Sequence, residues 1–174
     1  MEPENQTEFL EKMFLTKNMQ YENGKLIIFG RNAIMINMQL FVQLIKHFID
    51  NEPGLLENLM YNSISAIEKD YRERQGSKEN FLTMVKEVIS VTGLGLLEIE
   101  VGKTNGIIHI KVNPLATAYV ELYGLSANPI CHLIKGAMKK VFEFVYDSEG
   151  DISENACIAQ GKGECLLIFQ KRSQ

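Results

Sequence analysis

Long apolar runs and a secretory signal are both absent from this sequence. Polar residues such as Asn37, Gln43 and Lys46 interrupt the longest apolar candidates, so none is able to span a bilayer. The first fifteen residues carry four glutamates and lack the basic start and the apolar run of a signal peptide. We therefore expect a soluble, cytoplasmic protein with no membrane partner.

An excess of basic charge is absent as well. The 174 residues include 18 Lys and Arg against 22 Asp and Glu, which gives a net charge of −4. No stretch concentrates the basic residues in the way that a duplex-binding face does. We expect no direct nucleic-acid partner.

Recognisable catalytic motifs are missing too. Gly93-Leu94-Gly95 lacks the third glycine and the preceding strand of a dinucleotide-binding turn. Ser126 and Ser153 have no base partner at a recognisable spacing, and three cysteines do not hold an ordinary four-cysteine iron–sulfur cluster. We assign no catalytic residue, which argues against an enzyme.

Cysteine is scarce, with three residues in the whole chain. A chain of this length buries roughly two thirds of the surface that its unfolded form exposes, so it needs neither a crosslink nor a metal merely to fold. An odd number of cysteines in a reducing compartment indicates free thiols, a nucleophile or a metal site.

The residues that are present predict an α/β (α+β) domain. Apolar residues three and four positions apart, with capping residues, predict helices at about 33–50, 55–75, 77–92 and 128–146. Alternating apolar residues and turn residues predict strands at about 26–29, 96–101, 106–112, 156–159 and 166–169. Residues 113–126 are ambiguous between strand and loop. We expect the helices to cover one face of a mainly antiparallel sheet.

The N-terminal segment forms a separate part of this prediction. Residues 1–17 are acidic and weakly helical, and Asn23-Gly24 is typical of a tight turn. The segment has one apolar side, which fits a docking or packing helix and consists of Phe9, Leu10, Met13 and Phe14. We expect an N-terminal helical extension and turn over residues 1–24, followed by the main domain over residues 25–171.

The three cysteines lie in the last quarter of the chain. Cys131 falls in the first turn of the helix predicted after Asn128-Pro129, where free amides and the helix dipole favour a thiolate. Cys157 and Cys165 flank the predicted terminal hairpin, and a three-residue loop at Gln160–Lys162 would place them opposite each other. Two thiolates in such positions could share a metal.

Several interpretations of these cysteines are open. They could be small buried hydrophobes, or Cys157 and Cys165 could form a disulfide. A closed zinc site would need a fourth protein ligand, for which Glu154 is preferred over Asp151 and His132. Since Glu154 precedes Cys157 by three residues, it must lie in a bend or a β-bulge to reach the same side of the strand.

A longer motif resembles a known family. The run Asn128–Gly136, then Glu154-x-x-Cys157 with the following Ile158–Gly161, and then Cys165, is similar to the 4-vinyl reductase domain family. The resemblance covers approximately residues 25–169.

Members of this family include the sensor domains of bacterial phenol-responsive transcription activators, in which three cysteines and one glutamate hold a zinc. In this chain 22 residues separate the first cysteine from the glutamate, two precede the second cysteine and seven precede the third, which is similar to that site. The resemblance therefore implies one zinc bound by Cys131, Glu154, Cys157 and Cys165.

The family fold is similar to that of nitric-oxide-sensing haem domains and of vesicle-tethering subunits, and it is often dimeric. The resemblance thus implies a homodimer that binds a small apolar or planar ligand. Candidates for the lining of a ligand pocket are Phe81, Met84, Val85 and Phe142. Phenol recognition does not transfer, because the family's phenol sensors use a pocket tryptophan and this chain contains no tryptophan.

Three functions compete at this point. The leading hypothesis is a zinc-containing regulatory domain that binds a small molecule without catalysis and signals to a separate output protein. An enzyme or enzyme subunit in tetrapyrrole vinyl reduction is the first alternative, although such a reaction needs a hydride or electron carrier whose motif is not recognisable. The second alternative is a scaffold subunit of a tethering-like complex, which would need no ligand pocket.

Overall fold

A computed structural model describes residues 3–28 and 30–172 of the chain. The chain divides into a smaller unit, Met1–Asn37, and a larger unit, Met38–Gln174. None of the helices in the described part of the chain combines the length and the apolar character that a membrane crossing requires.

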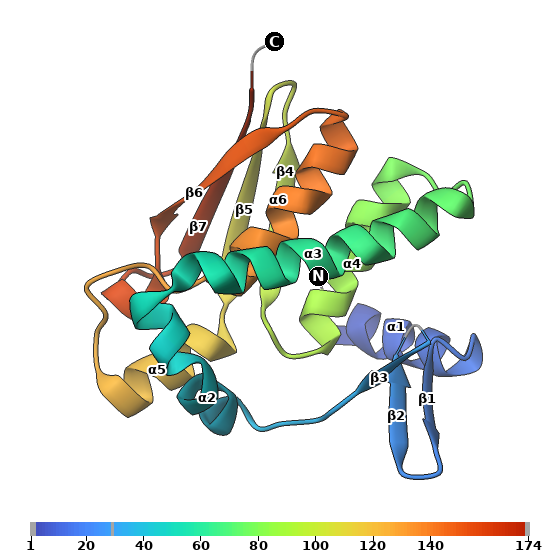
Figure 1. Ribbon diagram of the computed structural model, residues 1–174, viewed down its shortest axis with the longest axis horizontal. Helices are drawn as coiled ribbons and strands as arrows, with labels where there is room; N and C mark the ends of the chain where they lie inside the picture. Colours follow the sequence, from blue (N-terminus) through green and yellow to red (C-terminus); the bar gives the residue numbers. More distant parts are fainter. Residues whose placement is uncertain (1–2, 29, 173–174) are drawn as a thin grey trace. The chain divides into compact units, whose positions relative to one another are not determined.

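The smaller unit contains a helix and an antiparallel meander. Its elements are α1 (Pro3–Leu15), β1 (Met19–Glu22), β2 (Lys25–Ile28) and β3 (Arg31–Ala33), with the strand order β1-β2-β3 (Figure 1). The predicted turn at Asn23-Gly24 joins β1 to β2. On the predicted apolar side of α1, Met13 is buried, Leu10 is half-buried and Phe14 is exposed. The side chain of Phe9 and the predicted strand end at Phe29 lie outside the described residues.

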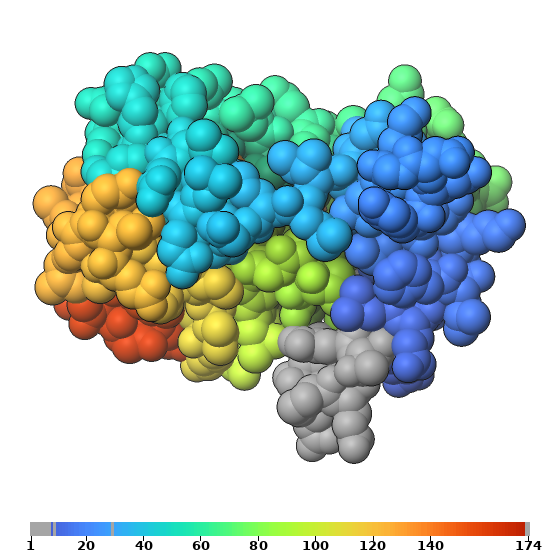
Figure 2. Space-filling view, turned by 90° about the horizontal axis from the view of Figure 1, so that it is seen from below, coloured from blue at the N-terminus to red at the C-terminus, as the bar shows by residue number. Residues whose placement is uncertain are grey.

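The larger unit packs helices against one face of an antiparallel sheet, as expected from the sequence (Figure 1). Its helices are α2 (Met38–Asn51), α3 (Pro53–Glu73), α4 (Lys78–Val91), α5 (Pro114–Tyr123) and α6 (His132–Tyr146). Its strands are β4 (Leu96–Val101), β5 (Asn105–Val112), β6 (Gly150–Ala156) and β7 (Cys165–Lys171), in the order β4-β5-β7-β6. Helices α4 and α6 contact the sheet, while α2 and α5 lie side by side on one face of this unit (Figure 2).

The side-chain alternation of the central strands decides which residues enter the core. On β7, Cys165, Leu167 and Phe169 are fully buried, whereas the intervening residues are half-buried or exposed. The antiparallel register places Cys165 opposite Ile110 of β5, which is also fully buried. Because strand residues two apart share a face, Cys165 lies on the helix-covered side of the sheet.

Helices α3 and α6 cross at very short distance. A Cβ atom added to Gly136 would lie 2.0 Å from the backbone oxygen of Glu57, so only glycine permits this approach. Polar contacts follow the crossing: Tyr61 donates to Glu143 at 2.6 Å, and Lys140 pairs with Glu68 at 2.8 Å. The crossing fixes the position of α6, and with it the position of the residue that precedes the helix.

Several predicted elements differ from the structure. The strand predicted at 156–159 is wrong, because β6 ends at Ala156 and Ile158–Gln160 form a 3₁₀ helix. The helix predicted at 33–50 begins only at Met38, since residues 31–33 form β3 and residues 34–37 are irregular. The region left ambiguous between strand and loop contains α5, whose first turn is capped by the side chain of Asn113 with proline at the next position. The Asn113-Pro114 pair is the same start signal that predicts a helix after Asn128. Applied to residues 113–126, this signal would have predicted α5.

We expect Gly136→Ala to destabilise the fold by about 2 kcal/mol or more, because the new methyl group meets backbone rather than a movable side chain. Urea unfolding should show a lower midpoint for this variant. Gly163→Ala is the matched control, since no atom lies within 4 Å of a Cβ at that position. Equal midpoints for the two variants would contradict the close crossing.

Candidate metal centre

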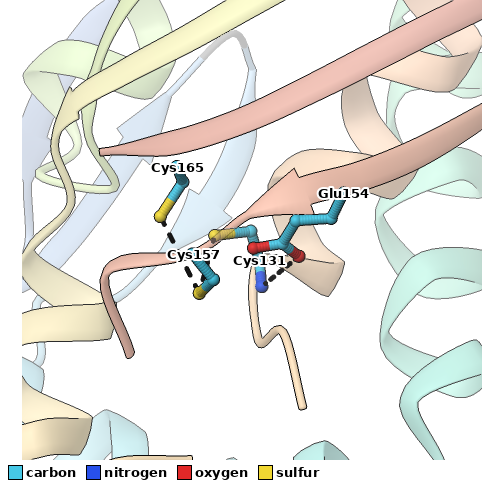
Figure 3. A group of neighbouring side chains, drawn as sticks. All are labelled: Cys131, Glu154, Cys157 and Cys165. Atoms are coloured by element: carbon cyan, nitrogen blue, oxygen red, sulfur yellow. Dashed lines mark hydrogen bonds between the residues drawn. The ribbon is translucent and has the colours of Figure 1, made fainter. Parts of the chain in front are cut away.

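Four side chains from three segments converge in the core of the larger unit (Figure 3). The sulfurs of Cys131, Cys157 and Cys165 and a carboxylate oxygen of Glu154 all lie within 4.8 Å of one another. All three cysteines are buried free thiols. The structure thus brings together the four residues that the sequence motif singles out.

Cys131 reaches the cluster from the N-terminus of α6. It is the N-cap residue of that helix, so the helix begins later than the start predicted at Asn128-Pro129. An N-cap residue leaves its own amide free of the helical hydrogen-bond pattern. That amide donates to Glu154 Oε2 at 3.0 Å, which joins two of the four groups directly.

Glu154 reaches the cluster through an irregularity in β6. The pairing of β6 with β7 shifts register between Glu154 and Ala156, which agrees with the bend or β-bulge expected from the spacing to Cys157. Its Oε2 atom is occupied by the Cys131 amide, whereas its buried Oε1 atom has no hydrogen-bond partner within the described residues. A buried polar atom without a partner is costly unless a ligand completes it.

Cys157 and Cys165 are joined by a short helical turn rather than by the predicted three-residue hairpin loop. The turn is the 3₁₀ helix η1 (Ile158–Gln160), and Gly161, with φ +79°, reverses the chain after it. The two cysteines are therefore not cross-strand neighbours: β6 ends at Ala156, and its ladder partner is Leu166. The amide of Ile158 donates to the sulfur of Cys165 at 3.2 Å.

The sulfur spacing fits one tetrahedral ion. The sulfur of Cys157 lies 3.9 Å from that of Cys131 and 3.8 Å from that of Cys165. A tetrahedral zinc with bonds to sulfur of about 2.3 Å separates its ligand sulfurs by about 3.8 Å. The set of soft thiolates with one carboxylate also matches the ligands that zinc accepts.

The protonation of the cluster reflects its crowding. Burial, followed by the nearby thiol of Cys157, raises the pKa of Glu154 to about 8. Hydrogen bonds with Cys131 and Cys157 lower the pKa of Cys165 to about 4, and the reciprocal contacts together with burial raise the pKa of Cys131. A bound cation would displace the protons that the metal-free cluster holds.

The two rival ligands have other partners. His132 points to α3, where its Nδ1 lies 3.0 Å from Glu57 Oε1. Asp151 is exposed on β6 and pairs with Arg172 at 2.7 Å. Neither belongs to the convergent group.

One further residue of the cluster is missed at the sequence level. The fully buried Asn113 donates through Nδ2 to the sulfurs of Cys131, at 3.1 Å, and Cys165, at 3.5 Å. Together with Cys131 it also lines a small hollow that has space for about one water molecule. Spacing alone does not indicate Asn113, because its approach to the thiols depends on how β5 pairs with β7.

The four residues suggested for a ligand pocket lie on α4 and α6. Phe81, Val85 and Phe142 are buried in the core, and Met84 is half-buried against it. Phe81 contacts the ring of Phe144, whereas Phe142 stacks on other rings, among them Phe169 of β7.

Several solved structures are similar to this one. The phenol-responsive sensory domain of the transcription activator PoxR, solved with phenol, has a TM-score of 0.74 and 14% identity over 91% of this chain and 87% of that chain. A vinyl-4-reductase family protein from Methanocaldococcus jannaschii has a TM-score of 0.58 and 17% identity over 81% and 85% of the two chains. A trafficking protein particle complex subunit 3 from Naegleria fowleri, covalently bound to palmitic acid, has a TM-score of 0.52 and 15% identity over 79% and 96%.

These similarities establish the fold. At the level of the fold, they confirm the resemblance to the 4-vinyl reductase domain and to phenol-responsive sensor domains. They also confirm the predicted fold class. The trafficking protein particle complex subunit and an H-NOX protein with a TM-score of 0.50 bear out the wider fold relationship. No protein-family model and no curated protein matches the sequence.

The raised pKa of Glu154 predicts a pH effect in metal-free protein. The protonated form stabilises the fold fully below the usual pKa of 4.5, and this stability is lost as the pH rises through about 8. As the pH rises from 5 to 8.5, we expect metal-free Glu154→Gln, which keeps an acceptor for the Cys131 amide, to gain about 4 kcal/mol of stability relative to metal-free wild type. Urea unfolding in the presence of a chelator measures this difference, and parallel pH profiles for the two proteins would refute it.

Proposed function

We propose that this chain is a zinc-containing domain that binds a small molecule and acts as a regulatory sensor without catalysis of its own. The observation that carries the proposal is the convergence of Cys131, Glu154, Cys157 and Cys165, with one buried carboxylate oxygen that lacks a hydrogen-bond partner in the described residues. When bound, zinc would supply a structural crosslink between the start of α6, the end of β6 and the start of β7.

The donor set supports a structural rather than a catalytic role. Four protein groups complete a tetrahedral shell, and a complete shell has no open position for water or substrate. The three thiols are buried in the core, with Cys157 and Cys165 fully enclosed. Their role would be to fix the turn between β6 and β7 against the N-terminus of α6.

The fold supports the ligand-binding part of the proposal. The similar sensory domain of PoxR is phenol-responsive and was solved with phenol. For this chain we propose an apolar or planar ligand other than phenol, taken up between the helices and the sheet. Phe81, Met84, Val85 and Phe142 are the proposed lining, and such a ligand acts by favouring one conformation of the domain over another.

The setting of the domain forms a further part of the proposal. We propose a cytoplasmic homodimer with residues 25–171 as the ligand-binding domain, residues 1–24 as its N-terminal extension, and a separate output protein as its partner. The exposed Phe14 beside the half-buried Leu10 on α1 supports an apolar contact with a second copy.

Deletion of residues 1–16 should then weaken the dimer in light scattering.

Replacement of one thiol tests the metal centre. We expect untagged wild-type protein to contain one zinc per chain by metal analysis, and Cys157→Ser to contain none. Because binding energy at a structural site is folding energy, the melting temperature of the variant should fall by about 10 °C. Asp151→Asn is the control, since this exposed carboxylate on β6, the strand that precedes Cys157, pairs with Arg172. Wild-type protein without zinc would end the proposal of a zinc domain.

Native mass spectrometry tests ligand and subunit count together. Under native conditions we expect the mass of a dimer with two zinc ions and a retained organic ligand. Under denaturing conditions we expect the mass of the single chain alone. A monomer mass across a wide concentration range would contradict the dimer. Turnover of a divinyl tetrapyrrole by the purified protein with a reductant would contradict the non-catalytic role and support the vinyl reductase alternative.

A further inference from the structure

Asn113 occupies a position where its two amide atoms serve different parts of the fold. It lies between the end of β5 and the first residue of α5 and is 1% exposed. Its Oδ1 accepts from the amide of Ala116 at 3.0 Å and so caps α5. Its Nδ2 donates to the sulfurs of Cys131 and Cys165. A single side chain therefore connects a helix start to two candidate metal ligands.

The charge of the proposed centre explains why donors are needed there. Three thiolates and one carboxylate around a divalent cation leave two negative charges in the core, and buried charge is costly without hydrogen bonds. The donors that reach these sulfurs include the Nδ2 group of Asn113 and the amide of Ile158. Of these two, Asn113 contacts two different sulfurs, which makes it the group best placed to set their separation.

The Oδ1 side of Asn113 connects the cluster to α5 and, through that helix, to α2. The helix that it caps, α5, lies against α2 (Figure 2). Between these two helices the hydroxyl of Tyr119 donates to Asp50 Oδ1 at 3.1 Å. The N-terminus of α5 is thus held at the thiol cluster, while Tyr119 holds the same helix to α2. This arrangement connects the thiol cluster to a pair of helices on the surface of the larger unit.

We propose that Asn113 is a positioning residue of the zinc centre, which holds the thiolates of Cys131 and Cys165 and couples metal retention to the order of the first turn of α5. This inference rests on the proposed zinc site. Outer groups that hydrogen bond to metal ligands commonly change metal affinity by about 10- to 100-fold when they are replaced.

Two substitutions separate the two roles of Asn113. Asn113→Asp keeps an oxygen that caps α5, but it replaces the Nδ2 donor by an acceptor. Asn113→Ser keeps a short capping oxygen without adding charge, and it also loses the reach to the sulfurs. The measurement is the rate at which zinc passes from the purified protein to an excess of a chromogenic chelator. We expect both variants to release zinc about tenfold faster than wild type or more.

The control variant removes a cap that is remote from the metal ligands. Ser77 caps α4 by accepting from the amide of Asn80, and Lys78 beside it pairs with Asp147 at the far end of α6. Ser77→Ala should lower the melting temperature and leave the zinc release rate unchanged. A purely structural role for Asn113 would leave the zinc release rate of its variants at the wild-type value, as expected for Ser77→Ala.

A measurement on wild-type protein tests the inference even if the Asn113 variants fail to fold. Removal of zinc should raise the hydrogen-exchange rate at the amide of Ala116 about tenfold or more, whereas the amide of Asn80 should be unaffected. Unchanged exchange at Ala116, or zinc release from Asn113→Asp at the wild-type rate, overturns the inference while the zinc site stands. Wild-type protein that holds no zinc overturns the zinc site and this inference together.

Discussion

The close approach of α3 and α6 at Gly136 is the constraint on which the rest of the larger unit depends. Because the backbones nearly touch there, the two helices cannot slide or rotate past each other without a clash. The N-terminus of α6 then holds Cys131 at the thiol cluster, and the middle of the helix carries Phe142 into the core. Ion pairs such as Lys135 with Glu57, at 2.9 Å, fix the crossing from its edge.

Each candidate ligand comes from a place where regular structure ends or is interrupted. Cys131 is a helix cap, Glu154 lies at a register shift of β6, Cys157 is the N-cap of the 3₁₀ helix η1, and Cys165 is the first residue of β7. At such places backbone amides are free of the helix and strand patterns, and two of them donate to Glu154 and to a sulfur. The irregular backbone therefore supplies both the direction of the ligands and the donors that accompany their charge.

Much of this fold could be predicted from the sequence because its helices and its β4–β5 hairpin follow local periodicity. The irregularity of the strand at Glu154 was also predictable, as a bend or a bulge, since the three-residue spacing to Cys157 permits no regular strand. The position of Asn113 beside two sulfurs was not, because it depends on the long-range register of β5 and β7. Nor was the turn after β6, where Gly161 permits a compact reversal that the pattern of apolar residues does not reveal.

The strand order has a consequence for how the domain assembles. Strands β4 and β5 are neighbours in sequence and in the sheet, as are β6 and β7, so each hairpin forms from local contacts. The hairpins meet where β7 pairs with β5, along a register that runs from Asn105 opposite Gln170 to Ile110 opposite Cys165. Before β7 pairs with β5, Asn113, which follows the β4–β5 hairpin, is remote from the thiol of Cys165, which begins β7. A completed thiol cluster therefore reports that both halves of the sheet have joined in the correct register.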